Sequence, residues 1–72
     1  MVISEKFGVA IRMLRAQFGI SQEKLALETN IDRSYIGEIE RGTTNVSLEI
    51  IQKLASFFGI PISELFKIIE NE

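Results

Sequence analysis

Three glycines, Gly19, Gly42 and Gly59, each follow a segment in which apolar residues recur every three or four positions. That recurrence is typical of an amphipathic helix. A glycine just past such a segment ends the helix at little cost, because glycine adopts the left-handed backbone conformation without a steric clash. No stretch alternates apolar and polar residues with the period of two that a half-buried strand requires. The sequence therefore predicts an all-α fold built from short helices.

Residues that can cap helix N-termini stand where each periodic segment begins. A break at Thr29-Asn30-Ile31 and the proline in Ile60-Pro61-Ile62 add two more boundaries, because the residue before a proline avoids the helical conformation. Together these signals predict five helices with the N-caps Ser4, Ser21, Asp32, Ser47 and Ser63, the last helix covering about residues 63–70. The side chains expected in the core are Phe7, Ile11, Leu14, Phe18, Leu25, Ala26, Ile36, Ile39, Leu48, Ile51, Leu54, Ala55, Phe58, Leu65 and Ile68.

The length and composition limit what else the chain can be. Its 72 residues predict one domain over residues 1–72, with a modest core. There is no cysteine and no histidine, which excludes disulfides and the usual zinc and iron ligand sets, so no cofactor is expected. The apolar runs are too short to span a membrane, and the N-terminal MVISEKF lacks a secretion-signal pattern. We expect a cytoplasmic protein without a membrane partner or small-molecule ligand.

The charge balance gives no support for a nucleic-acid partner. The formal net charge is −2 at neutral pH, whereas domains that bind DNA usually carry a clear basic excess. A DNA-binding function therefore has to be argued from local sequence pattern.

The segment of about residues 21–42 has that pattern: two short helices joined by about three residues, as in a helix-turn-helix. Ala26 is small where the two helix axes approach each other closely. Asn30 occupies the turn, and asparagine tolerates a left-handed backbone better than most residues. The apolar contacts between the helices would come from Leu25, Ile31, Ile36 and Ile39. In a motif of this kind the second helix enters the major groove of DNA.

Two longer runs in one register resemble the phage-repressor/Cro-like (XRE-type) helix-turn-helix family. They are Gly8…Ile11-Arg12…Leu14-Arg15…Gly19-Ile20-Ser21-Gln22-Glu23-Lys24-Leu25-Ala26 and Tyr35-Ile36…Ile39-Glu40-Arg41-Gly42…Asn45…Ser47-Leu48…Ile51…Leu54-Ala55…Phe58-Gly59-Ile60…Leu65-Phe66. The resemblance covers roughly Phe7 to Phe66 and implies a five-helix, lambda-repressor-like DNA-binding domain. Within the family, the segments 32–36 (DRSYI) and 40–42 (ERG) look most like the controller proteins of restriction–modification systems, which are dimeric regulators of their own operons.

The resemblance implies DNA contacts at matching positions. The residues expected to contact bases are Arg33, Ser34, Gly37 and Glu38, and those expected to contact phosphates are Gln22, Tyr35, Arg41, Thr43, Thr44 and Asn45. For three of these residues, a role without any DNA contact also explains the residue type. Ser34 can serve helix-start chemistry alone, Glu38 can simply face solvent, and Arg41 can sit near the negative end of its helix without touching DNA. Two departures from the family pattern are Asn30, where glycine is commoner, and a loop at 43–45 (TTN) that lacks the usual basic residues.

The resemblance also implies two structural roles. Arg15 and Glu40 match the positions of an ion pair that links the first and third helices. Relatives pair through the C-terminal end of the fold, where this sequence has surplus apolar residues. The expected homodimer interface consists of Phe57, Ile62, Phe66 and Ile69.

The sequence favours one class of function, leaves a second open and gives little support to a third. The first is a sequence-specific DNA-binding transcriptional regulator that binds a palindromic operator on double-stranded DNA as a homodimer. The alternative is an antitoxin or another protein-interaction module on the same fold, which the acidic balance and the weakly basic loop favour. An enzyme is not expected, because the sequence has no glycine-rich phosphate loop and no visible nucleophile–base pair.

Overall fold

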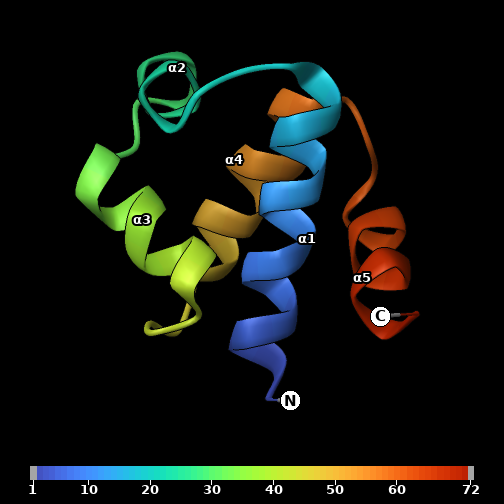
Figure 1. Cartoon of the computed structure of the whole chain (residues 1–72). Coiled ribbons are helices and arrows are strands. Elements are labelled where there is room, and N and C mark those ends of the chain that lie inside the picture. Colours follow the sequence, from blue (N-terminus) through green and yellow to red (C-terminus); the bar gives the residue numbers. More distant parts are fainter. Residues whose placement is uncertain (1, 72) are drawn as a thin grey trace.

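The computed structural model describes residues 2–71, and this part of the chain forms five helices: α1 (Ile3–Phe18), α2 (Gln22–Thr29), α3 (Arg33–Arg41), α4 (Leu48–Phe58) and α5 (Ile62–Glu70). The predicted all-α fold is confirmed. In Figure 1, α1 runs through the middle of the molecule, with α2 and α3 on one side of it and α5 on the other. Helix α4 packs against both α2 and α5. None of the described helices is both long and apolar enough to cross a bilayer.

Side-chain caps begin the three middle helices, as predicted. The side-chain oxygens of Ser21, Asp32 and Ser47 accept hydrogen bonds from backbone N–H groups in the first turn of α2, α3 and α4, at 3.0, 2.9 and 3.2 Å. Each cap satisfies one of the N–H groups that a helix start leaves without a partner. The boundaries of the helix-turn-helix were therefore readable from the sequence.

The outer two helices begin earlier than predicted, and the caps assigned to Ser4 and Ser63 are wrong. In α1 the N-cap is Val2, whose backbone N–H donates to the Glu5 carboxylate at 3.2 Å. In α5 the N-cap is Pro61, whose carbonyl accepts the first backbone hydrogen bonds of the helix. Proline is suited to this place because its backbone lacks an N–H group and none is needed before the first turn of the helix.

Left-handed residues end the first four helices. The φ angles of Gly19, Gly42 and Gly59 are 66°, 74° and 73°, and Asn30, which ends α2, has a φ of 58°. These are the stop positions that the sequence predicted. The N–H of Ile31 donates to the Ala26 carbonyl at 3.2 Å and completes the turn toward α3.

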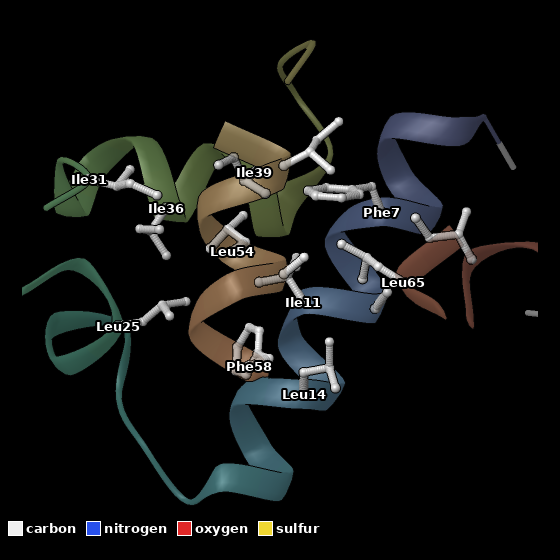
Figure 2. Packing of buried hydrophobic residues seen from close by; sticks show 14 of the residues in the cluster. Phe7, Ile11, Leu14, Leu25, Ile31, Ile36, Ile39, Leu54, Phe58 and Leu65 are labelled. Atoms are coloured by element: carbon white, nitrogen blue, oxygen red, sulfur yellow. The ribbon is translucent and has the colours of Figure 1, made fainter. Parts of the chain in front are cut away.

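The core receives side chains from all five helices, and Figure 2 shows them converging between α1, α3 and α4. The largest fully buried side chains are Ile11, Leu25, Ile36, Ile39, Leu54, Leu65 and Ile69. All but Ile69 were expected in the core. This common core fixes α2 and α3 against the rest of the molecule.

Three core assignments at helix ends and on α5 are corrected by the structure. Phe18 and Leu48 are 50% and 76% exposed, because they are the last residue of α1 and the first of α4, where the apolar stripe extends past its neighbours. On α5 the buried pair is Leu65 and Ile69, four residues apart, and Ile68 is half-buried. Apolar residues cover two adjacent faces of α5, and periodicity alone does not say which one packs inward.

Candidate nucleic-acid interface

Helix α3 has one buried and one exposed face. Its buried residues are Ile36, Gly37, Ile39 and Glu40, whereas Arg33, Ser34, Glu38 and Arg41 are exposed. The apolar side chains on the inner face hold the helix to α1 and α2. The outer face therefore presents a row of charged and hydroxyl groups on a rigidly held helix, which is the arrangement that reading a groove requires.

Arg33, the first residue of α3, lies opposite the first turn of α2. Its Nε is 3.4 Å from Oε2 of Glu23, and both side chains are more than half exposed. The ion pair joins the N-terminal ends of α2 and α3. In the sequence, Glu23 stands out only as part of the family-like run Ser21-Gln22-Glu23-Lys24. Nothing in the helical periodicity links it to a residue on another helix.

The hydroxyl of Ser34 is held by the residue that caps its helix. Both the backbone N–H and the hydroxyl of Ser34 donate to Oδ1 of Asp32 at 2.9 Å. These hydrogen bonds lower the pKa of Asp32 below its ordinary value, because they stabilise the ionised carboxylate. With its proton engaged, the Ser34 hydroxyl is left with free lone pairs and faces solvent as an acceptor.

The C-terminal half of the exposed face belongs to Glu38 and Arg41. Gly37 is buried, and a Cβ built on it would lie 3.2 Å from Nη1 of Arg41. The Arg41 guanidinium thus covers Gly37, one helical turn before it. At the position where Gly37 was predicted to contact a base, the free protein therefore exposes the side chain of Arg41.

The loop after α3 is tied to the helix by hydroxyl groups. The Tyr35 hydroxyl donates to the Asn45 carbonyl at 3.5 Å, and the Thr43 hydroxyl donates to the Glu38 carbonyl at 3.3 Å. Tyr35 is half-buried, and its ring also packs against the core. The Thr44 hydroxyl lies 3.5 Å from the Asn45 carbonyl. These hydrogen bonds hold the loop 43–45 close to α3.

Gln22, at the start of α2, is anchored by a buried carboxylate. Glu40 is 3% exposed and its Oε2 accepts from Arg15 Nε at 2.8 Å. Its Oε1 accepts from Arg15 Nη2 at 3.1 Å and from Gln22 Nε2 at 2.9 Å. Arg12 adds a hydrogen bond to the Glu40 backbone carbonyl at 3.1 Å. One carboxylate therefore connects α1, α2 and α3.

The third guanidinium nitrogen of Arg15 is also used, since Nη1 donates to the Ile20 carbonyl at 2.9 Å. The hydrogen bond and charge of Glu40 raise the pKa of Arg15 above its ordinary value. Among the described residues, no buried side-chain nitrogen or oxygen lacks a hydrogen-bond partner. This complete satisfaction gives the network a fixed geometry. Gln22 keeps one amide hydrogen and its carbonyl oxygen for a partner outside the protein.

The residues expected at a dimer interface do not all lie on the surface. Ile69 is 1% exposed inside the subunit core, so its assignment to the interface is wrong. Ile62 is 38% exposed, Phe66 is half-buried, and Phe57 is half-buried with its ring edge-on to Phe58 at a centroid distance of 5.1 Å. Of the four residues expected at the interface, Phe57, Ile62 and Phe66 therefore keep part of their side chains exposed.

Comparisons with known proteins agree with this geometry. A family model described as helix-turn-helix matches residues 11–65. The control protein C.BamHI of Bacillus amyloliquefaciens is 45% identical over 60 residues, which are 82% of this chain and 74% of that protein. The crystal structure of the restriction–modification controller protein C.AhdI from Aeromonas hydrophila has 51% identity and a TM-score of 0.82, over 88% of this chain and 96% of the other. The controller C.Esp1396I, solved as a tetramer with its natural 35 base-pair operator, has 25% identity and a TM-score of 0.88, over 99% and 93%.

Proposed function

Because this chain belongs to the XRE-type helix-turn-helix family and is similar to restriction–modification controller proteins, we propose that it is a sequence-specific regulator of transcription that binds its operator as a homodimer. The observation that carries the proposal is the exposed polar face of α3, held in place by the buried Glu40 network. It acts by binding alone, without a catalytic step. The neighbour solved on its operator supports DNA as the partner.

The exposed face of α3 supplies base readers of complementary chemistry. The guanidinium of Arg33 can donate two hydrogen bonds to O6 and N7 of a guanine. Ser34, whose proton is held by Asp32, reads an amino group of adenine or cytosine as an acceptor. Glu38 accepts from a cytosine amine. Donor and acceptors on one helix face give the preference for a particular sequence.

Phosphate contacts flank these readers on both sides. Gln22 lies at the positive N-terminal end of α2, where backbone N–H groups and the helix dipole favour an anion. The other phosphate contacts come from Tyr35 and Arg41 on α3 and from Thr43, Thr44 and Asn45 in the loop that follows it. Most of these groups are neutral, so the protein releases few counterions and its affinity falls less steeply with salt than that of a basic repressor.

A selection of bound sequences from a random DNA pool tests the proposal. We expect a two-fold-symmetric site whose half-site centres are about one helical turn, roughly 10 base pairs, apart. Arg33→Ala should weaken binding to that site by about 1–3 kcal/mol and blur the preference at one base position in each half-site.

The matched control is Lys53→Ala, which removes an exposed cation from α4 and should leave the base preference unchanged. If the wild-type protein enriches no sequence at low salt, the proposed function is wrong. If Arg33→Ala binds every single-base variant of the site as the wild type does, Arg33 is not a base reader.

The homodimer rests on the partly exposed apolar residues Phe57, Ile62 and Phe66 near and on α5. Ile62→Asp places a charge in that surface, where desolvation is costly, and should weaken dimerisation by about tenfold or more. Sedimentation at several protein concentrations measures the change. Leu48→Asp is the control, because Leu48 is 76% exposed in the first turn of α4 and outside the proposed surface. A wild type that stays monomeric at micromolar concentration would rule out this dimer.

A further inference from the structure

An acidic side chain lies beside the arginine that is the main candidate for reading a base. Glu23 and Arg33 are the second residue of α2 and the first of α3, and their side chains are 69% and 54% exposed. A carboxylate on a surface that approaches phosphates opposes binding through its charge. An exposed ion pair of this kind also contributes little to stability. Neither DNA affinity nor stability therefore explains why Glu23 lies at this interface, which leaves a role in recognition to consider.

The geometry of the ion pair supplies that role. The atom of Arg33 nearest to the Glu23 carboxylate is Nε, at 3.4 Å from Oε2. The guanidinium group is planar and its donors have a fixed fork geometry. With Nε as the atom nearest to Glu23, the terminal edge formed by Nη1 and Nη2 stays available for another partner. That edge carries two parallel N–H donors, the pattern that matches O6 and N7 of guanine.

We propose that Glu23 is a positioning residue that holds Arg33 by its Nε and so presents the two terminal nitrogens to a guanine. The proposal rests on the proposed DNA-binding function. Glu23 then has two opposite effects. It lowers affinity for any DNA through its charge, and it raises discrimination at the base that Arg33 reads, because the guanidinium is already oriented before DNA arrives.

The test measures binding of Glu23→Gln to the selected operator, to operators in which the base read by Arg33 (here called the Arg33 base) is changed, and to unrelated DNA. We expect binding to unrelated DNA to tighten by about two- to fivefold at low salt, with the difference closing as salt rises. Discrimination at the Arg33 base should fall by about two- to fivefold. Discrimination at the other positions should stay as in the wild type.

Three further variants separate positioning from charge. Glu28→Gln removes an exposed carboxylate from the same helix, where Glu28 pairs with Lys24 at 3.2 Å, and should not alter discrimination. Glu23→Asp keeps the charge but shortens the reach, so discrimination should fall without tighter binding to unrelated DNA. In an Arg33→Ala background, Glu23→Gln should no longer change discrimination at that base.

The outcomes distinguish this inference from the function on which it rests. A wild type without any sequence preference overturns the proposed function itself. A wild type that selects a site while Glu23→Gln discriminates at the Arg33 base equally well overturns only the positioning role. An effect of Glu23→Gln that persists undiminished in the Arg33→Ala background also overturns it, since the two residues would then act independently.

Discussion

Gly8→Ala is expected to lower the free energy of unfolding by about 3 kcal/mol, even though alanine is the better helix former. Gly8 lies in the middle of α1 where that helix crosses α3. A Cβ at this position would overlap the carbonyl oxygen of Ile39 and lie 2.7 Å from that of Glu40. Both obstacles are backbone atoms of a helix whose inner face is held in the core by Ile36 and Ile39, so neither can move aside cheaply. Urea unfolding followed by circular dichroism measures the loss.

Gly37→Ala is the matched control for this prediction. Gly37 is also a buried helical glycine, but its added Cβ would meet only the end of the flexible Arg41 side chain, at 3.2 Å. The gain in helix propensity should then offset any strain and leave stability within about 1 kcal/mol of the wild type. Equal stabilities for the two alanine variants would mean that the close approach of α1 and α3 at Gly8 does not constrain the fold.

Arg15→Ala is expected to cost about 3–5 kcal/mol, because it leaves the buried Glu40 carboxylate without its cation. Glu40→Ala should cost less, since Arg15 is 20% exposed and can turn toward water. The double variant removes both charges and should lose less stability than the sum of the single losses, by about 0.5–3 kcal/mol.

Thermal or urea unfolding of the four proteins gives this coupling energy. Lys24→Ala and Glu28→Ala, with their double variant, form the reference cycle for an exposed pair, where coupling of about 0.3–0.5 kcal/mol is expected. Strictly additive losses for Arg15 and Glu40 would contradict the view that the network is a single unit.

Most of the fold was predictable because its signals are local. The cap residues Ser21 and Ser47 and the left-handed Asn30 act within a few residues of themselves, so the helix boundaries could be read from the chain. Apart from the shifted caps of the two outer helices, the errors came where a neighbour elsewhere in the sequence decides. Leu48 fits the apolar period of α4 but lies beyond the core, and Ile69 packs inward because α5 turns that face toward the core.

The candidate site divides in the same way. The exposed position of Arg33, Ser34 and Glu38 follows from the period of α3 once the helix is recognised. The partners of these residues do not follow from it. The contact between Glu23 and Arg33 depends on the angle between α2 and α3, and the bond from Gln22 to Glu40 depends on how both helices meet α1.

The separation of the two faces of α3 has a consequence for how such proteins diverge. Substitutions at exposed positions such as Arg33, Ser34 and Glu38 remove no buried contact, and changes of this kind usually alter stability by less than about 0.5 kcal/mol. Ile36, Ile39 and Glu40 on the other face carry the packing and the buried network. Selection can therefore exchange one operator preference for another while the scaffold stays intact. Within such a lineage, the outer face of α3 should drift fastest where operators differ, and its inner face should keep its residues.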